Sequence, residues 1–239
     1  MRIVKRFLIA DPGASFSFKE SFYRLRSLVE HGMPKQNEGE EKPAHVIMVS
    51  SVAASEGKST VAANPALSLA QKHRAVLLID ADLRNPSQIR MLGKDAAGPV
   101  SLAKLLQSEL LTVKQIANAI VYDDETHLMT LLDVAPTKNP GHLLSSESMR
   151  RLLSVCRRTM DYIVIDTPPV GLFADSGKLT DMADGMVLVV RQDVVPACDI
   201  NDAGDVLSQG KAKLLGSLPE KTALAFTCGL GPTGLEVRA

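Results

Sequence analysis

The sequence predicts an α/β protein with a doubly wound, mostly parallel sheet and helices on both faces of that sheet. Five short runs of residues are apolar throughout, which is typical of strands that are buried on both faces. Helical patterns of apolar residues separate these runs, and such alternation of strands and helices indicates a parallel sheet. The five predicted strands are 45–51, 75–82, 127–135, 162–167 and 185–191.

Length and composition indicate one globular domain. The chain has 239 residues, of which 45% are hydrophobic and 23% are charged, so it is too apolar for a disordered protein. Lysine and arginine total 27, as do aspartate and glutamate, so the formal net charge is zero. That balance argues against a nucleic-acid partner. The apolar runs fall far short of the roughly 18 residues that span a bilayer, and we expect a cytoplasmic protein.

The first 44 residues differ from the rest of the chain. Apolar residues recur at helical spacing between Phe18 and Val29, which predicts an amphipathic helix. Residues 33–44 are polar and charged and include two prolines, a composition that is typical of a linker. After residue 215 the apolar residues show no clear period. The predicted division is an N-terminal helix and linker (1–44), a main domain (45–215) and an irregular tail (216–239).

A candidate phosphate loop, SSVAASEGKST at residues 50–60, joins the first predicted strand to the helix that follows it. In a P-loop, backbone N–H groups and a helix N-terminus surround a phosphate, and a lysine contacts its outer oxygens. Here the lysine is Lys58, and the next hydroxyl, Ser59, is the predicted Mg²⁺ ligand. The formal pattern has glycine where this chain has Val52, so a chance turn exposed to solvent is the alternative. The predicted nucleotide-binding residues are Ser55, Glu56, Gly57, Lys58, Ser59 and Thr60.

Three aspartates are predicted to lie beside this loop. Asp80 and Asp82 end the second predicted strand, and Asp166 ends the fourth. Ligands of open parallel sheets bind beyond the carboxyl ends of the strands, where these side chains are expected to meet. Carboxylates at that edge can hold Mg²⁺ and organise water. The alternative for each one alone is a structural cap or turn residue.

These motifs make the chain resemble the bacterial tyrosine kinases, which are P-loop kinases of capsule and exopolysaccharide synthesis. LLIDADLRNP (77–86) resembles the second Walker-type motif of that family, and DYIVIDTPPV (161–170) is similar to its Walker B motif. DMADGMVLVVR (181–191) resembles the strand that follows. The resemblance covers about residues 20–210 and implies a P-loop NTPase fold.

The resemblance also implies an activity and its cofactors. The chain would transfer a phosphoryl group from ATP, with Mg²⁺, to protein tyrosine. Lys58 would contact the β- and γ-phosphates, and either Asp80 or Asp82 would accept the proton of the substrate hydroxyl. The implied catalytic residues are Lys58, Asp80, Asp82 and Asp166, and the implied metal-site residues are Ser59, Asp80, Asp82 and Asp166.

Partners are implied in the same way. ESFYRLR (20–26) resembles the family's glutamate- and arginine-containing helix, which there serves ring-shaped self-association. A homo-oligomer formed through the N-terminal helix is therefore expected. The family's kinases are activated by the cytoplasmic tail of a separate membrane protein. A transmembrane polysaccharide co-polymerase or adaptor is thus the expected partner in trans, and it would hold the chain at the inner face of the membrane.

The sequence departs from the family pattern at several positions. Ser55 stands where the family commonly has glycine, which tolerates positive φ. Pro65 lies inside the helix predicted after the loop, where it removes a hydrogen bond and should bend the helix or end it early. Tyr23 replaces the first arginine of the N-terminal motif. The family's autophosphorylated tyrosines lie at the C-terminus, whereas the three tyrosines of this chain are Tyr23, Tyr122 and Tyr162.

Three functions are therefore compared. The first is an ATP-dependent tyrosine kinase of exopolysaccharide synthesis or its regulation. The second is an ATPase of the partitioning and cell-division type, which shares the sheet and the acidic motifs. That class has a lysine five positions before the P-loop lysine, whereas this chain has Ala53, which favours the kinase. The third is a nucleotide-binding regulator that has lost phosphoryl transfer, as Ser55 and Pro65 suggest.

Overall fold

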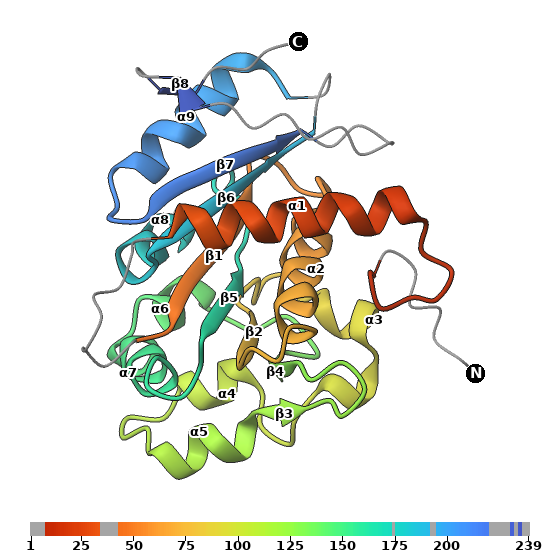
Figure 1. Ribbon diagram of the computed structural model, residues 1–239. Helices are drawn as coiled ribbons and strands as arrows, with labels where there is room; N and C mark the ends of the chain where they lie inside the picture. The colour runs from red at the N-terminus through yellow and green to blue at the C-terminus, as the bar shows by residue number, and fades with distance from the viewer. Residues whose placement is uncertain are drawn as a thin grey trace.

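The computed structural model describes residues 8–33, 43–173, 175–191, 195–219, 230–231 and 234–235. Its centre is a seven-stranded sheet in the order β3-β4-β2-β5-β1-β6-β7 (Figure 1). Neighbouring strands are parallel except for the short edge pair of β3 and β4. The strands of this sheet are β1 (His45–Ser51), β2 (Val76–Asp80), β3 (Val121–Tyr122), β4 (Met129–Leu131), β5 (Tyr162–Asp166), β6 (Gly185–Val190) and β7 (Lys213–Pro219). A separate pair consists of β8 (Leu230–Gly231) and β9 (Gly234–Leu235).

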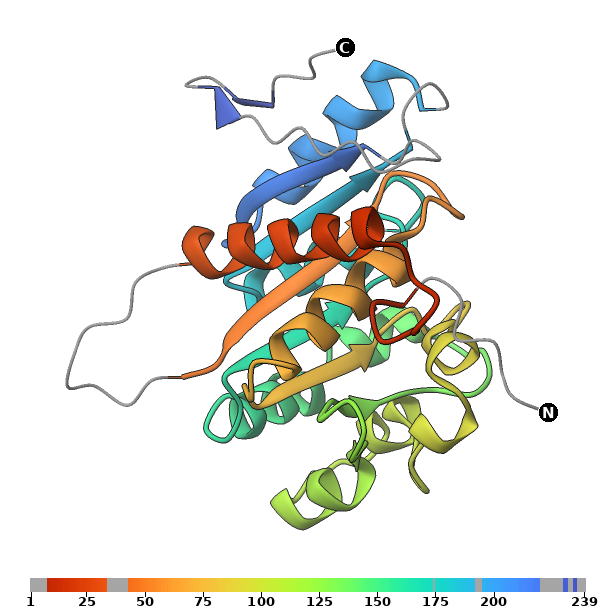
Figure 2. The ribbon, with the colours of Figure 1, turned by 45° about the vertical axis from the view of Figure 1, so that its right-hand side comes forward.

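Helices cover both faces of the sheet, so the predicted fold class is confirmed. Successive residues of a strand point to opposite faces, and along β1 Ile47 and Val49 join one buried cluster while Val46 and Met48 join the other. The first cluster lies under α1 and α2, which are side by side on one face (Figure 2). The second lies under α4 to α9. The helices are α1 (Phe16–Gly32), α2 (Lys58–Ala70), α3 (Gln88–Leu92), α4 (Leu102–Leu106), α5 (Val113–Ala119), α6 (Pro140–Leu144), α7 (Glu147–Cys156), α8 (Asp175–Leu179) and α9 (Ala197–Ser208).

The five predicted strands all occur, with changes at their ends. The third is much shorter than the predicted 127–135, because β4 contains only Met129–Leu131. The sequence did not predict β3, which has two residues, or β7, whose residues lack a continuous apolar run. β7 continues to Pro219, past the predicted start of the irregular tail, since it pairs with β6. Residues 220–229 of that tail lie outside the described residues.

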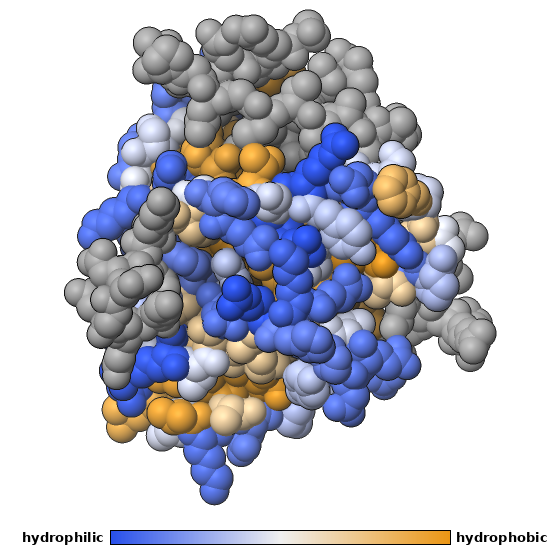
Figure 3. Space-filling view, in the orientation of Figure 1, coloured by the Kyte–Doolittle hydropathy of each residue, from blue (hydrophilic) through white to orange (hydrophobic). Residues whose placement is uncertain are grey.

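The helix α1 is packed onto the main domain. Its buried side chains Phe22, Leu25 and Val29 share the hydrophobic cluster of α2. Arg26 donates two hydrogen bonds to Ser68 of α2, at 3.2 Å to the carbonyl oxygen and 2.9 Å to Oγ. The side of the molecule that carries α1 is mainly hydrophilic (Figure 3). No helix within the described ranges has the length and apolar character needed to cross a bilayer.

The helix α2 runs without a break from Lys58 to Ala70, with Pro65 buried inside it. The proline therefore does not end the helix early. The preceding residue anchors this part of the helix, because Asn64 Nδ2 donates to the Thr60 carbonyl at 2.9 Å and Asn64 Oδ1 accepts from the backbone N–H of Ile9 at 2.7 Å. The first turn of α2, which follows the candidate phosphate loop, is intact.

Pro65→Ala should raise the free energy of unfolding, by at most about 3 kcal/mol, because it restores a backbone N–H that can donate to the Val61 carbonyl. Urea unfolding of the two proteins measures the difference. Pro140→Ala is the matched control, since Pro140 occupies the start of α6, where a proline costs no helical hydrogen bond. A less stable Pro65→Ala variant would show that packing of the ring outweighs the lost bond.

Candidate functional site

Three adjacent strands bring the predicted site residues to one edge of the sheet. β5 lies between β1 and β2, and the three run parallel. Asp80 and Asp166 are direct neighbours in the register of β2 and β5, and both end their strands. The candidate loop follows β1 at the same edge and leads into α2 at Lys58. The strand ends therefore bring together the lysine and the aspartates, as the sequence predicts.

Lys58 lies among the carboxylates. Its Nζ is 2.7 Å from Asp82 Oδ2 and 3.4 Å from Asp166 Oδ1, and the residue is only 8% exposed. Burial opposes the charge of the ammonium group, but the negative charges of Asp166 and Asp82 outweigh it and raise the pKa of Lys58. Lys58 is therefore positively charged, and these two acids hold its ammonium group beside the loop.

Asp80 and Asp166 are both fully buried. Burial, with the like charge of Asp166, raises the pKa of Asp80 to about 8, although backbone N–H groups of Gln88 and Ser87 oppose the shift. Those N–H groups donate to Asp80 Oδ2 at 3.0 and 2.9 Å, and the N–H of Asp82 donates to Oδ1 at 3.2 Å. Burial also raises the pKa of Asp166, against the effect of Lys58. Asp80 thus holds the backbone of the segment after β2.

Two polar residues that sequence reasoning missed complete the cluster. Ser87 Oγ donates to Ser59 Oγ at 2.6 Å. Gln88 Nε2 donates to the Ser59 carbonyl at 3.0 Å and to Asp166 Oδ2 at 2.8 Å. Within the described residues, Gln88 Oε1 is buried and has no hydrogen-bond partner. Nothing in the local sequence marks a serine and a glutamine in this role, because only the fold of the segment after β2 brings them to Ser59.

Glu56 lies in the predicted phosphate loop. Its side chain holds the loop in place through hydrogen bonds from backbone N–H groups. The carboxylate is 2% exposed and accepts from the backbone N–H of Ala53 at 2.6 Å and of Arg191 at 2.8 Å. It thereby ties the loop to the end of β6. The next residue, Gly57, has φ of 82°, which places α2 directly after the turn. The loop is held so that α2 begins with its N-terminus facing the site.

The donor atoms at this edge suit a nucleotide with Mg²⁺. The first N–H groups of a helix have no acceptor within the helix and attract phosphate. Oxygen atoms of Ser59, Asp82 and Asp166 are the hard ligands that Mg²⁺ prefers. Within the described residues, no three acidic, histidine or cysteine side chains are placed to hold a metal alone. Mg²⁺ sites commonly complete their shell with phosphate and water, so the residues present fit the group.

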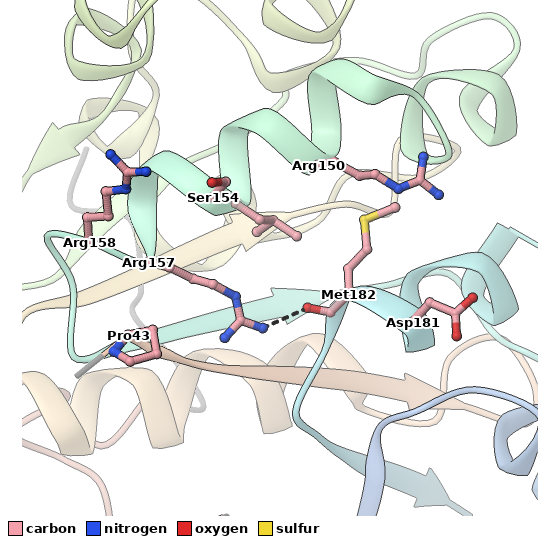
Figure 4. Close-up of a pocket in the computed structure, with 8 residues that line it drawn as sticks. Pro43, Arg150, Ser154, Arg157, Arg158, Asp181 and Met182 are labelled. Atoms are coloured by element: carbon pink, nitrogen blue, oxygen red, sulfur yellow. Dashed lines mark hydrogen bonds between the residues drawn. The ribbon is translucent and has the colours of Figure 1, made fainter. Parts of the chain in front are cut away.

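Two cavities lie near opposite ends of the strands of the sheet. A cavity of about 350 Å³ adjoins the loop and is bounded by Val52, Ala53, the segment around Gly171 and α9. A larger cavity of about 810 Å³ lies at the opposite edge, beside the C-terminal end of α7 (Figure 4). There Arg157 donates to the Met182 carbonyl at 3.0 Å and forms an ion pair with Asp184 at 2.8 Å. The larger cavity is therefore separate from the candidate site.

Comparisons with known proteins agree with this geometry. A family model described as "ParA: NUBPL iron-transfer P-loop NTPase" matches residues 42–225. Tyrosine-protein kinase YwqD of Bacillus subtilis (strain 168) is 36% identical over 173 residues, which are 72% of this chain and 70% of that protein. The chain belongs to the bacterial tyrosine-protein kinase family. The resemblance inferred from the motifs is therefore confirmed.

Two further relatives show the extent of the match. The kinase domain of VpsO has a TM-score of 0.67 and 28% identity, and the alignment covers 87% of this chain and 99% of that domain. Succinoglycan biosynthesis transport protein ExoP of Rhizobium meliloti (strain 1021) is 30% identical over 183 residues, covering 75% of this chain but 22% of that protein. The matched segment thus makes up most of YwqD but only a small part of ExoP.

The candidate phosphate loop contains backbone strain at a position where this chain departs from the family pattern. Ser55, which stands where the family commonly has glycine, has φ of 64°. Residues with a Cβ atom are disfavoured in this left-handed region. The loop therefore adopts the backbone that a glycine would allow, even though the residue is serine. The departure from the family pattern therefore appears as strain at one exposed residue.

Ser55→Gly should raise the free energy of unfolding by about 1 kcal/mol, because glycine adopts positive φ without the steric cost. Thermal or urea unfolding of the purified proteins measures the change. Ser55→Ala is the control, since alanine removes the hydroxyl but keeps the Cβ atom and hence the strain. If Ser55→Ala stabilised the protein as much as Ser55→Gly, the strain argument would be wrong.

Proposed function

We propose that the chain transfers the γ-phosphoryl group of ATP to tyrosine hydroxyl groups of protein, in exopolysaccharide synthesis or its regulation. The observation that carries the proposal is the meeting of Lys58, Asp82 and Asp166 at the N-terminus of α2. Membership of the tyrosine-kinase family supports the choice of acceptor. The chemistry needs a cation for the phosphates, a proton acceptor and a metal site, and this cluster offers each.

Lys58 is the proposed phosphate ligand. Its 2.7 Å ion pair with Asp82 must exchange for contacts to the phosphate oxygens when ATP binds. The side chain lies at the first residue of α2, beside the helix N–H groups that attract the same phosphates. The lysine then compensates negative charge on the nucleotide instead of negative charge on the aspartate.

Asp82 is the proposed proton acceptor, and Asp80 the anchor. Both oxygens of Asp80 already accept backbone N–H groups, and the residue is fully buried. Asp82 faces Lys58 instead and is slightly exposed, at 4%. When the tyrosine oxygen bonds to the γ-phosphorus and the bond to the leaving ADP oxygen breaks, the hydroxyl proton passes to Asp82. The structure thus favours Asp82 where the sequence left both acids open.

Ser59 and Asp166 are the proposed Mg²⁺ residues, with Asp82 or Asp80 acting through bound water. When bound, Mg²⁺ neutralises charge that develops on the phosphate oxygens. Gln88 orients both residues, since its amide N–H donates to Asp166 and to the Ser59 carbonyl. Ser87 holds the Ser59 hydroxyl oxygen from the other side. The serine and the aspartate are therefore positioned by the segment after β2.

A membrane partner and self-association complete the proposal. The chain matches part of ExoP, a longer relative named a transport protein, which supports a membrane co-polymerase or adaptor acting in trans.

We also propose a homo-oligomer that forms through α1, but with contact residues that differ in part from those of the association motif. Arg26 of the association motif bonds to Ser68 within the same chain, so the more exposed Glu20 and Arg24 are better placed to contact a neighbour. No nucleic-acid partner is proposed, since the net charge is zero.

Incubation with ATP labelled at the γ-phosphate, Mg²⁺ and a random copolymer of glutamate and tyrosine tests the activity. Phosphotyrosine on the copolymer or on the chain is the expected result. Free phosphate without phosphotyrosine would favour the ATPase of the partitioning type, which the match to the ParA-type family model keeps as the second candidate. Nucleotide binding without turnover would favour the regulator that has lost transfer.

Lys58→Ala should abolish ATP binding or weaken it at least about 100-fold, which is about 2.7 kcal/mol, because the phosphates lose the lysine of the loop. Isothermal titration calorimetry with ATP and Mg²⁺ measures the affinity. Lys72→Ala is the matched control, since Lys72 lies after α2 and is half exposed beside Glu30. An unchanged affinity in Lys58→Ala would remove the phosphate-loop assignment.

Asp82→Asn should keep most of the nucleotide affinity while phosphoryl transfer to the copolymer falls at least about 100-fold, within the usual contribution of a general base. Single-turnover assays at saturating ATP separate the two quantities. Asp95→Asn, at an exposed acid outside the cluster, is the control. Transfer at the parent rate in Asp82→Asn would exclude Asp82 as the proton acceptor.

A further inference from the structure

The chain has three tyrosines, and they differ sharply in exposure. Tyr162 is 9% exposed at the start of β5. Tyr23 is half-buried on α1, where the guanidinium carbon of Arg26 lies 5.2 Å from its ring centre. Tyr122 is 53% exposed. A tyrosine must present its hydroxyl to a kinase site to be phosphorylated, and Tyr122 is the one placed to do so.

Tyr122 lies on an accessible part of the fold. It ends β3, the two-residue strand at one edge of the sheet (Figure 1). A turn follows directly, in which Asp123 Oδ1 accepts the N–H groups of Glu125 and Thr126 at 2.8 and 3.1 Å. Short edge strands with a neighbouring turn bury little backbone, and such segments separate from the sheet more easily than central strands do. The segment can therefore present its tyrosine to another molecule.

Among the described residues, the hydroxyl of Tyr122 has one hydrogen-bond partner. It shares a hydrogen bond of 2.8 Å with Nδ1 of His127, and the two rings are stacked with centres 6.2 Å apart. Tyr122 ends β3 and His127 follows the turn, and the hydrogen bond between them is exposed, so water can replace either partner. A solvent-exposed hydrogen bond of this kind adds little net stability, and contacts with a kinase site can replace it.

The strand register separates Tyr122 from the site of its own chain. Tyr122 pairs with Met129, which pairs in turn with Leu77, three residues before Asp80 on β2. Along the strands, the backbone of Tyr122 therefore lies about 10 Å from the end of β2 that carries Asp80. Across the sheet, it lies two strands from β2, which is again about 10 Å. A tyrosine side chain on that strand does not reach the cluster around Lys58. Phosphorylation of Tyr122 by this kinase site would therefore need a second copy of the chain.

We propose that Tyr122 is the phosphate acceptor in a reaction between two copies of this chain. The inference rests on the proposed kinase function and names its substrate. The Tyr122 oxygen of one copy bonds to the γ-phosphorus of ATP held by the other, and the bond to the bridging oxygen breaks to release ADP. The hydroxyl proton passes to the aspartate acceptor of the copy that holds ATP. The product carries a phosphate dianion beside Asp123, Asp124 and Glu125.

A mixing experiment tests the proposal. Lys58→Ala, which is not expected to use ATP, serves as acceptor, and Tyr122→Phe, whose active site is unaltered, serves as enzyme. After incubation with labelled ATP and Mg²⁺, mass spectrometry locates the phosphate. The expected result is phosphate at Tyr122 of the Lys58→Ala protein. A second acceptor that carries both Lys58→Ala and Tyr122→Phe should lose that label, whereas Lys58→Ala with Tyr23→Phe should keep it.

The glutamate–tyrosine copolymer separates this proposal from the kinase assignment. Tyr122→Phe should phosphorylate the copolymer at the parent rate, because Tyr122 lies outside the active site. If the copolymer is phosphorylated while Tyr122 is not, the acceptor proposal is overturned and the kinase function stands. If neither is phosphorylated, both are overturned. If the parent protein labels its own Tyr122 but the mixture leaves Tyr122 of the Lys58→Ala protein unlabelled, the reaction occurs within one chain and the two-copy reaction is overturned.

Discussion

The ion pairs of Lys58 with Asp82 and Asp166 organise the rest of the site. A buried carboxylate is costly unless a cation or several donors compensate it. Asp166 is fully buried and has Lys58 and Gln88 as partners, while Asp80 relies on backbone N–H groups. Removing the lysine would leave uncompensated acids between β2 and β5. The same cation that stabilises this edge of the sheet is therefore the group available to bind phosphate.

The scaffold explains why that cation can change partners. Lys58 is the first residue of α2, and Glu56 fixes the preceding loop through bonds to the N–H groups of Ala53 and Arg191. The backbone is thus held at both sides of the lysine, while the end of the long side chain is held by ion pairs that a phosphate can replace. A rigid loop with one adjustable cation is an arrangement that suits phosphate binding, because the N–H groups are already oriented before the ligand arrives.

Sequence reasoning found the parts of the site that follow from strand ends. Asp80, Asp82 and Asp166 directly follow apolar runs, and parallel strands must bring such residues to one edge. It missed Ser87 and Gln88, because their contacts with Ser59 and Asp166 depend on the path of an irregular segment. The strands β3 and β7 were missed for a related reason. Both lie at the edges of the sheet, where pairing with a neighbouring strand, and not a continuous apolar run, defines the strand. Of the two outcomes expected from Pro65, an early end of α2 does not occur, and the bonds of Asn64 anchor the unbroken helix.

The exchange of Lys58 between ligands also links nucleotide binding to proton transfer in the proposed mechanism. While Lys58 Nζ lies 2.7 Å from Asp82 Oδ2, the ammonium group occupies the oxygen that would accept the proton. When the lysine turns to the phosphates, that carboxylate oxygen is released from the ion pair. The oxygen is then open to the tyrosine hydroxyl as the phosphoryl group comes into position. Asp82 thus becomes accessible as the proton acceptor once ATP is bound, which couples acceptance of the tyrosine proton to the presence of the phosphoryl donor.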